Sequence, residues 1–429
     1  MLIDGQRYSI VLNITQKIKN CAIFIVNPCI FFCNSIKKEC IFARQNKKSN
    51  TIYMAIKIVE VTDKSSLNKF VDFNIQLYAG NPYHVPGLVE DELMTLRRDK
   101  NPAFDFCESI YFLAYKEDKI VGRIAGIINH KANATWNQQY ARFGFIDFID
   151  DEEVSSALFE AVEQWALQKG MNGIQGPLGF TDLDHEGLLV WGFDQLGTMA
   201  TAYSFPYYKE HLEKLGYVKD QDWNEFQIQI PKEVPEKHRR IAEIVMAKYG
   251  LKIKKFKRTK EIWPYAKKIF ELWNEAYKPL YGYSELSEKQ IEYYIKMYIP
   301  MLRLDLITLI VRESDDEVVG LAITLPSLSK ALQKSKGRLL PFGWFHLLKA
   351  LYMSGQVLDL YIMGVLPEYQ NKGVNALLFY DLIPIFNRYG FIYAESNPEL
   401  EMNYKVQSQW DYFETKHHKT RRAFIKHLK

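Results

Sequence analysis

A strand–turn–helix pattern between residues 359 and 388 constrains the fold of this chain more than any other feature. An apolar run from Leu358 to Val365 is short and β-rich, and it ends before Pro367. Apolar side chains then recur at helical spacing from Ala376 to Ile383. The stretch therefore predicts a buried strand, a polar turn and a helix, as in an α/β fold.

The turn between the predicted strand and helix contains a glycine and five larger residues. It reads Gln370-Asn371-Lys372-Gly373-Val374-Asn375. The first backbone N–H groups of a helix have no partner within the helix, and the helix dipole is positive there. Such a turn is suited to an anion such as a pyrophosphate, although many α/β domains contain a turn of this kind.

The residues around this turn resemble motif A of the GNAT acyltransferases. In that family a strand ending in Val-x-Pro-Glu-Tyr leads into Gln/Arg-x-x-Gly-x-Gly/Ala, and the loop and helix start hold the pyrophosphate of coenzyme A. Residues 365–373 (VLPEYQNKG) match, whereas Asn375 stands where the family has Gly or Ala. The resemblance implies an acetyl-CoA or longer acyl-CoA cosubstrate held by Met363, Val365, Gln370, Asn371, Lys372, Gly373, Val374 and Asn375.

Length and composition limit the remaining interpretations. A chain of 429 residues is expected to hold two or three domains. A net charge of +4 is small for this length and argues against a nucleic-acid partner. No established metal-ligand spacing occurs, so no metal is expected. Residues 1–53 do not resemble the rest of the chain and are interpreted as a non-native or disordered extension. After them only Cys107 remains, which predicts a reduced, cytoplasmic protein.

The chain repeats one order of predicted elements. Strand, helix, hairpin, strand and helix follow Met54, and the same order restarts at Leu251. This repeat predicts two tandem GNAT-like domains of mixed α/β fold. The predicted boundaries are 54–231, a linker helix at 232–250, and 251–429 for the domain with the acyl-CoA site. The first domain has four carboxylates at residues 150–153, at the position where a coenzyme site would have to bind the anionic pyrophosphate. They indicate a lost site.

Two other stretches are candidates for interfaces. The loop from Gly176 to Gly187 crowds three carboxylates and a histidine without an established ligand spacing. Its glycines favour a structured loop over a metal or acid–base site, with a lining role at the domain interface as the intermediate interpretation. The insert at 327–356 places basic residues before a Leu/Phe/Trp-rich face. That pattern predicts either peripheral membrane contact or packing against the other domain.

Catalysis of acyl transfer to an amine needs a base and an acid for the leaving thiolate. In the GNAT family the strand before the turn has an acidic residue near its start, and Asp359 occupies that position. An aspartate in an apolar strand is costly to bury unless it is used or paired. Strand alternation predicts that Asp359, Tyr361 and Met363 share one face. Glu395 is a second candidate base.

The family's second signature is an Asn followed about seven residues later by a Tyr that protonates the thiolate. Asn397 and Tyr404 fit this spacing, and Asn403 with Tyr412 is the competing pair. The basic stretch at 416–422 is interpreted as a solvated hairpin, with phosphate contact as the minor alternative.

These features resemble bacterial tandem GNAT proteins, some of which are similar to acyl-CoA-dependent ceramide synthases. The resemblance implies an N-acyltransferase that moves an acyl group from a CoA thioester to an amine acceptor, with a long-chain or lipid amine favoured. A Fem-type aminoacyl transferase is an alternative, but that class lacks the pyrophosphate turn that residues 370–373 retain. A non-catalytic acyl-CoA-binding protein is the other alternative.

Overall fold

The computed structural model describes residues 55–299, 302–353 and 355–429. The prediction for residues 1–53 lies outside the described residues. The N-terminal half contains β1 (Lys57–Glu60), α2 (Lys64–Leu77), α3 (Val89–Thr95), β2 (Cys107–Lys116), β3 (Lys119–Asn129), α4 (His130–Thr135), β4 (Tyr140–Phe148), α5 (Glu152–Gln168), β5 (Gly173–Gly176), β6 (Leu188–Trp191), α6 (Tyr207–Lys214) and β7 (Val218–Gln229).

The C-terminal half begins with a helix and then repeats a similar order. It contains α7 (Glu236–Tyr249), β8 (Leu251–Lys254), α8 (Trp263–Tyr277), α9 (Glu288–Tyr298), β9 (Ile307–Arg312), β10 (Val318–Pro326), α10 (Ser329–Ser335), α11 (Gly343–Tyr352), β11 (Val357–Val365), α12 (Val374–Tyr389), β12 (Tyr393–Ser396), β13 (Glu399–Leu400), α13 (Tyr404–Gln407) and β14 (Thr415–His427).

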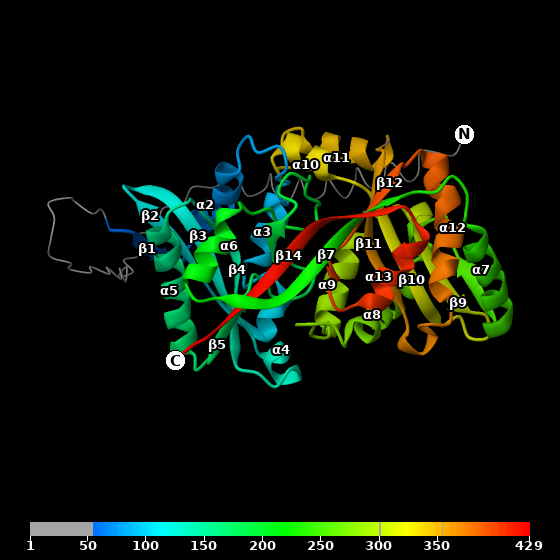
Figure 1. Ribbon diagram of the computed structural model, residues 1–429, viewed down its shortest axis with the longest axis horizontal. Helices are drawn as coiled ribbons and strands as arrows, with labels where there is room; N and C mark the ends of the chain where they lie inside the picture. Colours follow the sequence, from blue (N-terminus) through cyan, green and yellow to red (C-terminus); the bar gives the residue numbers. More distant parts are fainter. Residues whose placement is uncertain (1–54, 300–301, 354) are drawn as a thin grey trace.

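One mixed sheet runs through both halves (Figure 1). Its main path has the order β1-β2-β3-β4-β5-β14-β7-β12-β11-β10-β9-β8, with β6 beside β14 and β13 beside β7. The predicted hairpin is present, because β2 and β3 pair up to Lys116 and Lys119. The two residues between them, Glu117 and Asp118, have positive φ angles, as a tight hairpin turn requires. The predicted mixed α/β class is confirmed.

The two halves exchange strands at the centre of this sheet. The last strand, β14, pairs with β5 and β7 of the N-terminal half, and β7 pairs in turn with β12 of the C-terminal half. Figure 1 shows β14 (red) and β7 (green) crossing the middle of the molecule side by side. Strand β7 begins at Val218 and is long enough to pair with strands of both halves.

The prediction of a solvated hairpin at 416–422 is wrong. These residues lie in β14, where Lys419 and Arg421 are 0% and 1% exposed. Lys419 Nζ lies 2.9 Å and Arg421 Nε 2.5 Å from the carboxylate of Glu225 on β7. Glu225, the buried counter-charge of Arg421, lies 196 residues earlier in the chain. The basic run therefore has the sequence pattern of a solvated segment, although it is buried.

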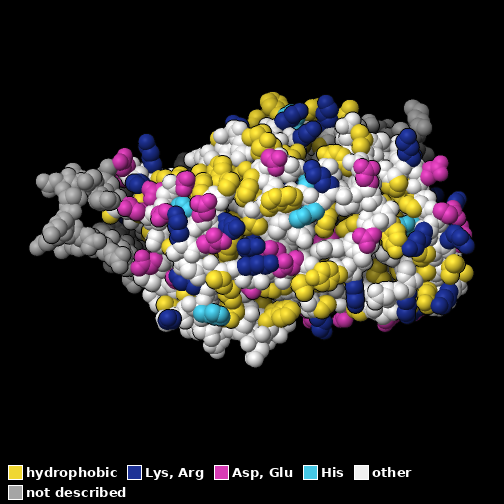
Figure 2. Space-filling view, in the orientation of Figure 1, with side chains coloured by type: hydrophobic (Ala, Val, Ile, Leu, Met, Phe, Trp, Pro, Cys, Tyr) yellow, Lys and Arg dark blue, Asp and Glu magenta, His cyan; other side chains and the backbone are white. Residues whose placement is uncertain are grey.

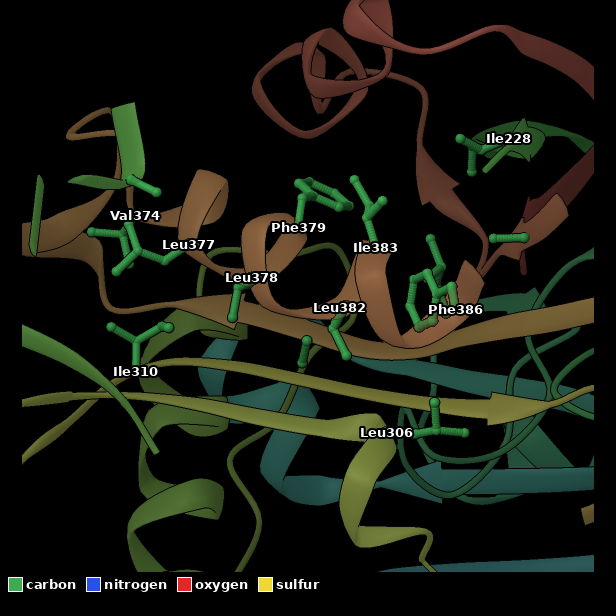
Figure 3. Close-up of a cluster of buried hydrophobic side chains, with 14 of the residues drawn as sticks. Ile228, Leu306, Ile310, Val374, Leu377, Leu378, Phe379, Leu382, Ile383 and Phe386 are labelled. Carbon is green, nitrogen blue, oxygen red and sulfur yellow. The ribbon is translucent and has the colours of Figure 1, made fainter. Parts of the chain in front are cut away.

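Helix α12 covers one face of the C-terminal strands and so fixes the turn before it. Its side chains, including Leu378 and Leu382, face Leu306 and Ile310 across the core (Figure 3). Fully burying a leucine contributes about 2 kcal/mol, so several such contacts hold the helix in place. Helices α8 and α9 cover the opposite face, and α7 packs beside α12.

Candidate active site

Strand β11 carries the predicted aspartate and then separates from its neighbour. Parallel pairing with β12 extends from Val357 to Leu360, whereas β11 itself continues to Val365. On the other side, the ladder with β10 shifts register and leaves Tyr361 as an extra residue. The bulge bends β11, whose pairing with β10 resumes at Ile362. The edge that faced β12 is therefore open after Leu360.

The bulge also changes which side chains share a face. Met363 packs with the cluster around α12, whereas Tyr361 packs with the cluster around α8. The prediction that Asp359, Tyr361 and Met363 share one face is therefore wrong. Strict alternation fails at a bulge, and a bulge is defined by the partner strand rather than by the strand's own sequence.

Polar side chains line the open edge of β11. The carbonyl oxygens of Tyr361, Met363 and Val365 accept hydrogen bonds from the side chains of Asn397, Tyr277 and Gln370, respectively. A carbonyl oxygen has two lone pairs and can accept a second hydrogen bond. The edge can therefore receive N–H groups from an extended chain that contains amides.

The turn after β11 contains its predicted glycine in the left-handed region. Gly373 has φ 79° and precedes α12 without a side-chain cap. The N–H groups at the helix start, including those of Val374 and Asn375, therefore have no acceptor within the helix, which is an arrangement that suits an anion. The amides of Gln370 and Lys372 instead donate to carbonyls within the turn. The positive end of the helix dipole adds to the attraction for an anion.

The surroundings of the turn are compatible with negative charge. Asn371 and Lys372 are exposed, and the Lys372 ammonium lies 5.3 and 5.2 Å from the rings of Tyr249 and Tyr369. Helix α7 covers the other side, because a Cβ added at Gly373 would lie 2.7 Å from Ile241. Glycine is thus required at this position for both space and backbone angle.

The two predicted bases lie next to each other. Asp359 of β11 and Glu395 of β12 are partners in the parallel ladder, and their exposed fractions are only 6% and 7%. On β14, His418 is an extra residue in the ladder with β7. Its Nε2 atom lies 2.8 Å from the Glu395 carboxylate, without hydrogen-bond geometry, and Lys419 Nζ lies 3.5 Å from the same oxygen.

Asp359 has the properties of a base that works near neutral pH. Burial raises the pKa of Asp359 to about 7, and the charge of Glu395 adds to the rise, while Ser327 and Lys419 oppose it. Asp359 Oδ1 has no hydrogen-bond partner among the described residues. A carboxyl group with a near-neutral pKa and a free acceptor oxygen can remove a proton from an amine.

Glu225 has a different role in the same cluster. Burial alone would raise the pKa of Glu225, but Arg421 and Lys419 hold it at about 2. Glu225 is therefore a fixed negative charge that positions Lys419 beside Glu395. Four residues of this cluster were not predicted as site residues, because they become neighbours only through the strand exchange: Glu225, His418, Lys419 and Arg421.

The two predicted acids, Tyr404 and Tyr412, lie on the surface and contact different residues. The Tyr404 hydroxyl on α13 contacts Met402 Sδ at 3.5 Å. The Tyr412 hydroxyl accepts a hydrogen bond of 2.8 Å from Lys237. The structure thus brings together Asp359 and Glu395 and leaves Tyr404 and Tyr412 exposed.

The loop after β5 lies at the interface between the halves. Asp184 Oδ2 accepts hydrogen bonds from the backbone N–H groups of Phe180 and Thr181, which order the loop. Asp182 lies beside Trp273 and Tyr283 of the C-terminal half, and Asp184 lines a cavity between α3 and α9. The interface-lining interpretation is confirmed. Within the described ranges, no three His, Cys, Asp or Glu side chains form a group that could hold a metal ion.

The fold is that of tandem GNAT proteins. A tandem GNAT protein from the clavulanic acid biosynthesis pathway matches with a TM-score of 0.52 and 11% identity, over 87% of this chain and 99% of that one. A GCN5-related glucosamine N-acetyltransferase region in a fungal multi-domain GH3 β-N-acetylglucosaminidase has the same TM-score and identity, over 89% of this chain and 39% of that one. The predicted tandem GNAT fold is confirmed.

Sequence comparison gives more specific relatives. The chain is 28% identical over 322 residues to the bacterial ceramide synthase of Caulobacter vibrioides. The aligned region covers 74% of this chain and 82% of the relative. It is also 28% identical over 321 residues to protein YghO of Escherichia coli, over 74% and 80% of the two chains. No protein-family model matches. The predicted resemblance to tandem GNAT and ceramide synthase-like proteins is confirmed, and these similarities support an acyltransferase.

Proposed function

We propose that this protein is an N-acyltransferase that uses an acyl-CoA thioester and a long-chain or lipid amine. The proposal depends most on the buried carboxyl of Asp359, whose Oδ1 atom has no hydrogen-bond partner among the described residues. Asp359 lies on the strand whose edge opens before an uncapped helix start. Acyl transfer from an acyl-CoA uses all three features: a base for the amine, a strand edge for the amides of the pantetheine arm, and N–H donors for the pyrophosphate.

In the proposed reaction, Asp359 accepts a proton from the amine, with Glu395 as the alternative base. The amine nitrogen forms a bond to the thioester carbonyl carbon, and the C–S bond breaks. The thiolate leaves and takes a proton from Tyr404, or from Tyr412 as the competing acid. The products are an amide and coenzyme A.

The cosubstrate is proposed to lie along the C-terminal half. The carbonyl groups of Met363 and Val365 receive the pantetheine N–H groups, and the helix start at Gly373, Val374 and Asn375 receives the pyrophosphate. Gln370 anchors the turn through the Val365 carbonyl, and the exposed Asn371 and Lys372 face the phosphates. A long acyl chain agrees with the name of the relative from Caulobacter vibrioides, a ceramide synthase.

The proposed domain division is 54–231, a linker helix at 232–250, and 251–429, with β14 returning to the first domain. The first domain has no coenzyme site in this proposal. Its corresponding helix, α5, is capped by Asp151, which accepts a hydrogen bond from Glu153 N and lies 2.7 Å from Lys116. A helix start that already holds a carboxylate repels a phosphate.

Peripheral membrane contact through α11 is also proposed. One face of the insert packs against the N-terminal half through Leu332, Leu347 and Leu351. The other face exposes 71% of Phe342 and 51% of Phe345. Figure 2 shows apolar and basic side chains along the upper edge, where α10 and α11 lie. Apolar and basic side chains together favour an anionic lipid surface. None of the described helices is long and apolar enough to span a membrane.

Thermal shift and thiol release test the acyl-CoA proposal. Acetyl-, medium- and long-chain acyl-CoAs are compared on wild type, Gly373→Glu and Asp359→Asn. Long-chain acyl-CoA should raise the melting temperature of wild type and Asp359→Asn but not of Gly373→Glu, because a carboxylate at the helix start repels the pyrophosphate. Thiol release with a long-chain amine should occur only in wild type. No shift with any thioester would refute the proposal, and a shift without thiol release would favour the non-catalytic binding protein.

A further inference from the structure

A small acidic and aromatic cavity lies between the two halves of the molecule. Its walls come from α3, from the loop after β5 and from α9, and it encloses about 50 Å³ of free space. The lining residues are Asp91, Thr95, Asn101, Leu183, Asp184, Tyr293, Tyr294, Met297 and Tyr298. This volume suits a headgroup of a few atoms rather than a whole chain.

Tyrosine rings form one wall of this cavity. The rings of Tyr293 and Tyr294 have centroids 5.4 Å apart, and those of Tyr294 and Tyr298 are stacked with centroids 5.9 Å apart. The face of an aromatic ring attracts a cation. Two carboxylates, Asp91 and Asp184, complete the lining. Rings and carboxylates together favour a positively charged group of small size.

The loop that closes the cavity contains a cluster of buried carboxyl groups, and burial raises the pKa of Asp182 to about 7 and that of Asp184 to about 6. Asp182 Oδ1 and Glu186 Oε1 are buried without a hydrogen-bond partner among the described residues. Asp182 lies next to the cavity, beside Leu183, which lines it. Arg142 acts on this cluster, but it donates hydrogen bonds to the carbonyl groups of Gly179 and Gly282. Burial favours the neutral form of these carboxyl groups, and a cationic ligand nearby would stabilise their charged form.

The cavity is electrostatically continuous with the proposed catalytic strand. Burial raises the pKa of Tyr361 to about 12, and Asp91 of the cavity wall and Asp359 both add to the rise. Tyr298 of the cavity wall likewise has its pKa raised by burial and then by Asp91 and Tyr361. The hydroxyl group of Tyr361 on β11 is therefore near enough to be influenced by the charges of both Asp91 and Asp359.

We propose that this cavity binds the ammonium group of the amine acceptor through Asp91, Asp184 and the tyrosines of α9. The inference rests on the proposed N-acyltransferase function and assigns recognition of the acceptor to the interface between the halves. Binding the amine as a cation selects amines over alcohols of the same chain length, before the proton is removed at Asp359.

Calorimetric titration with decylammonium and with decanol tests the inference without any thioester. Wild type should bind decylammonium at least about tenfold more tightly than decanol, since a buried charge contact is worth roughly a factor of ten. Asp184→Asn should remove most of this difference and leave decanol binding unchanged. Because Asp184 also orders its own loop, Asp91→Asn provides a second variant with the same expected result.

Asp105→Asn is the matched control, since Asp105 is an exposed carboxylate that pairs with Lys289 at the start of α9. It should bind both probes like wild type. Equal affinity of wild type for the two probes would overturn the inference, as would unchanged decylammonium binding in both cavity variants. Thermal shift with palmitoyl-CoA separates the two proposals. If the cavity variants lose decylammonium binding while no thioester binds wild type, the cavity stands and the acyltransferase proposal fails.

Discussion

Replacing Asp359 with asparagine should stabilise this protein at alkaline pH while it abolishes thiol release. The pKa of Asp359 is raised from 3.8 to about 7, with burial as the largest cause. Between these two values the folded state holds a proton that the unfolded state has lost. Stability due to this group is therefore complete below the unfolded pKa and is lost as the pH rises through the folded pKa.

The size of the effect follows from the shift. About three pKa units at roughly 1.36 kcal/mol each give about 4 kcal/mol of penalty for the charged carboxylate above pH 7. Asparagine has nearly the same shape and no charge, so it avoids this penalty. The Ser327 hydrogen bond loses its charged acceptor, which offsets about 1–2 kcal/mol. We expect the variant to be more stable by about 2–3 kcal/mol at about pH 8.5.

Urea denaturation at two pH values measures this difference. At about pH 5.5 the folded state still retains its proton, so the advantage of Asp359→Asn should be smaller by about 2 kcal/mol than at about pH 8.5. Asp105→Asn, at an exposed ion pair, should change stability by less than about 1 kcal/mol at either pH. An advantage of equal size at both pH values would refute the reasoning, since it would show that Asp359 is not a buried carboxyl with a raised pKa.

Four further perturbations act on the base, the buried ion pairs, the turn and the exposed insert. The rate of thiol release at saturating acyl-CoA should rise with pH through about 7 and then level, because Asp359 acts only after it has lost its proton; a flat profile from pH 6 to 8 would contradict this. Arg421→Met should lower the free energy of unfolding by about 3–5 kcal/mol in urea titration, because it leaves Glu225 buried with only Lys419. Gly373→Ala should lower it by about 1–2 kcal/mol, since alanine is strained at φ 79° and its Cβ would contact Ile241. Phe342→Ser with Phe345→Ser should reduce sedimentation with anionic vesicles about tenfold, whereas Ile244→Ser, at an exposed apolar residue of α7, should not.

The sequence predicted those parts of the molecule that depend on local order. The strand, turn and helix around Gly373 were predictable because glycine, proline and helical spacing act within about 20 residues. The hairpin at residues 116–119 was predictable for the same reason. The family resemblance also indicated Asp359 as a candidate base, and Glu395, the second candidate, lies beside it on β12, which pairs with β11 in parallel.

The features that the sequence did not predict depend on contacts between segments that are distant in the chain. The bulges at Tyr361 and His418 are defined by the partner strands, so period-two alternation gave the wrong face for Met363. The basic run before Arg422 was wrongly assigned to solvent, because the carboxylates that pair with it in the core lie on other strands. Its partners, Glu225 and Glu395, come from two other strands.

The strand exchange gives the N-terminal half a physical role in the proposed site, although that half is proposed to lack a coenzyme site. Glu225, on the last strand of that half, fixes Lys419, and Lys419 lies 3.5 Å from Glu395. Lys419 in turn lowers the pKa of Asp359 against the effect of burial. The charge on Glu225 therefore influences the proposed base through one intermediate side chain. Separating the halves would remove the buried counter-charges of Lys419 and Arg421 together, so neither half is expected to fold as a stable unit that retains β14.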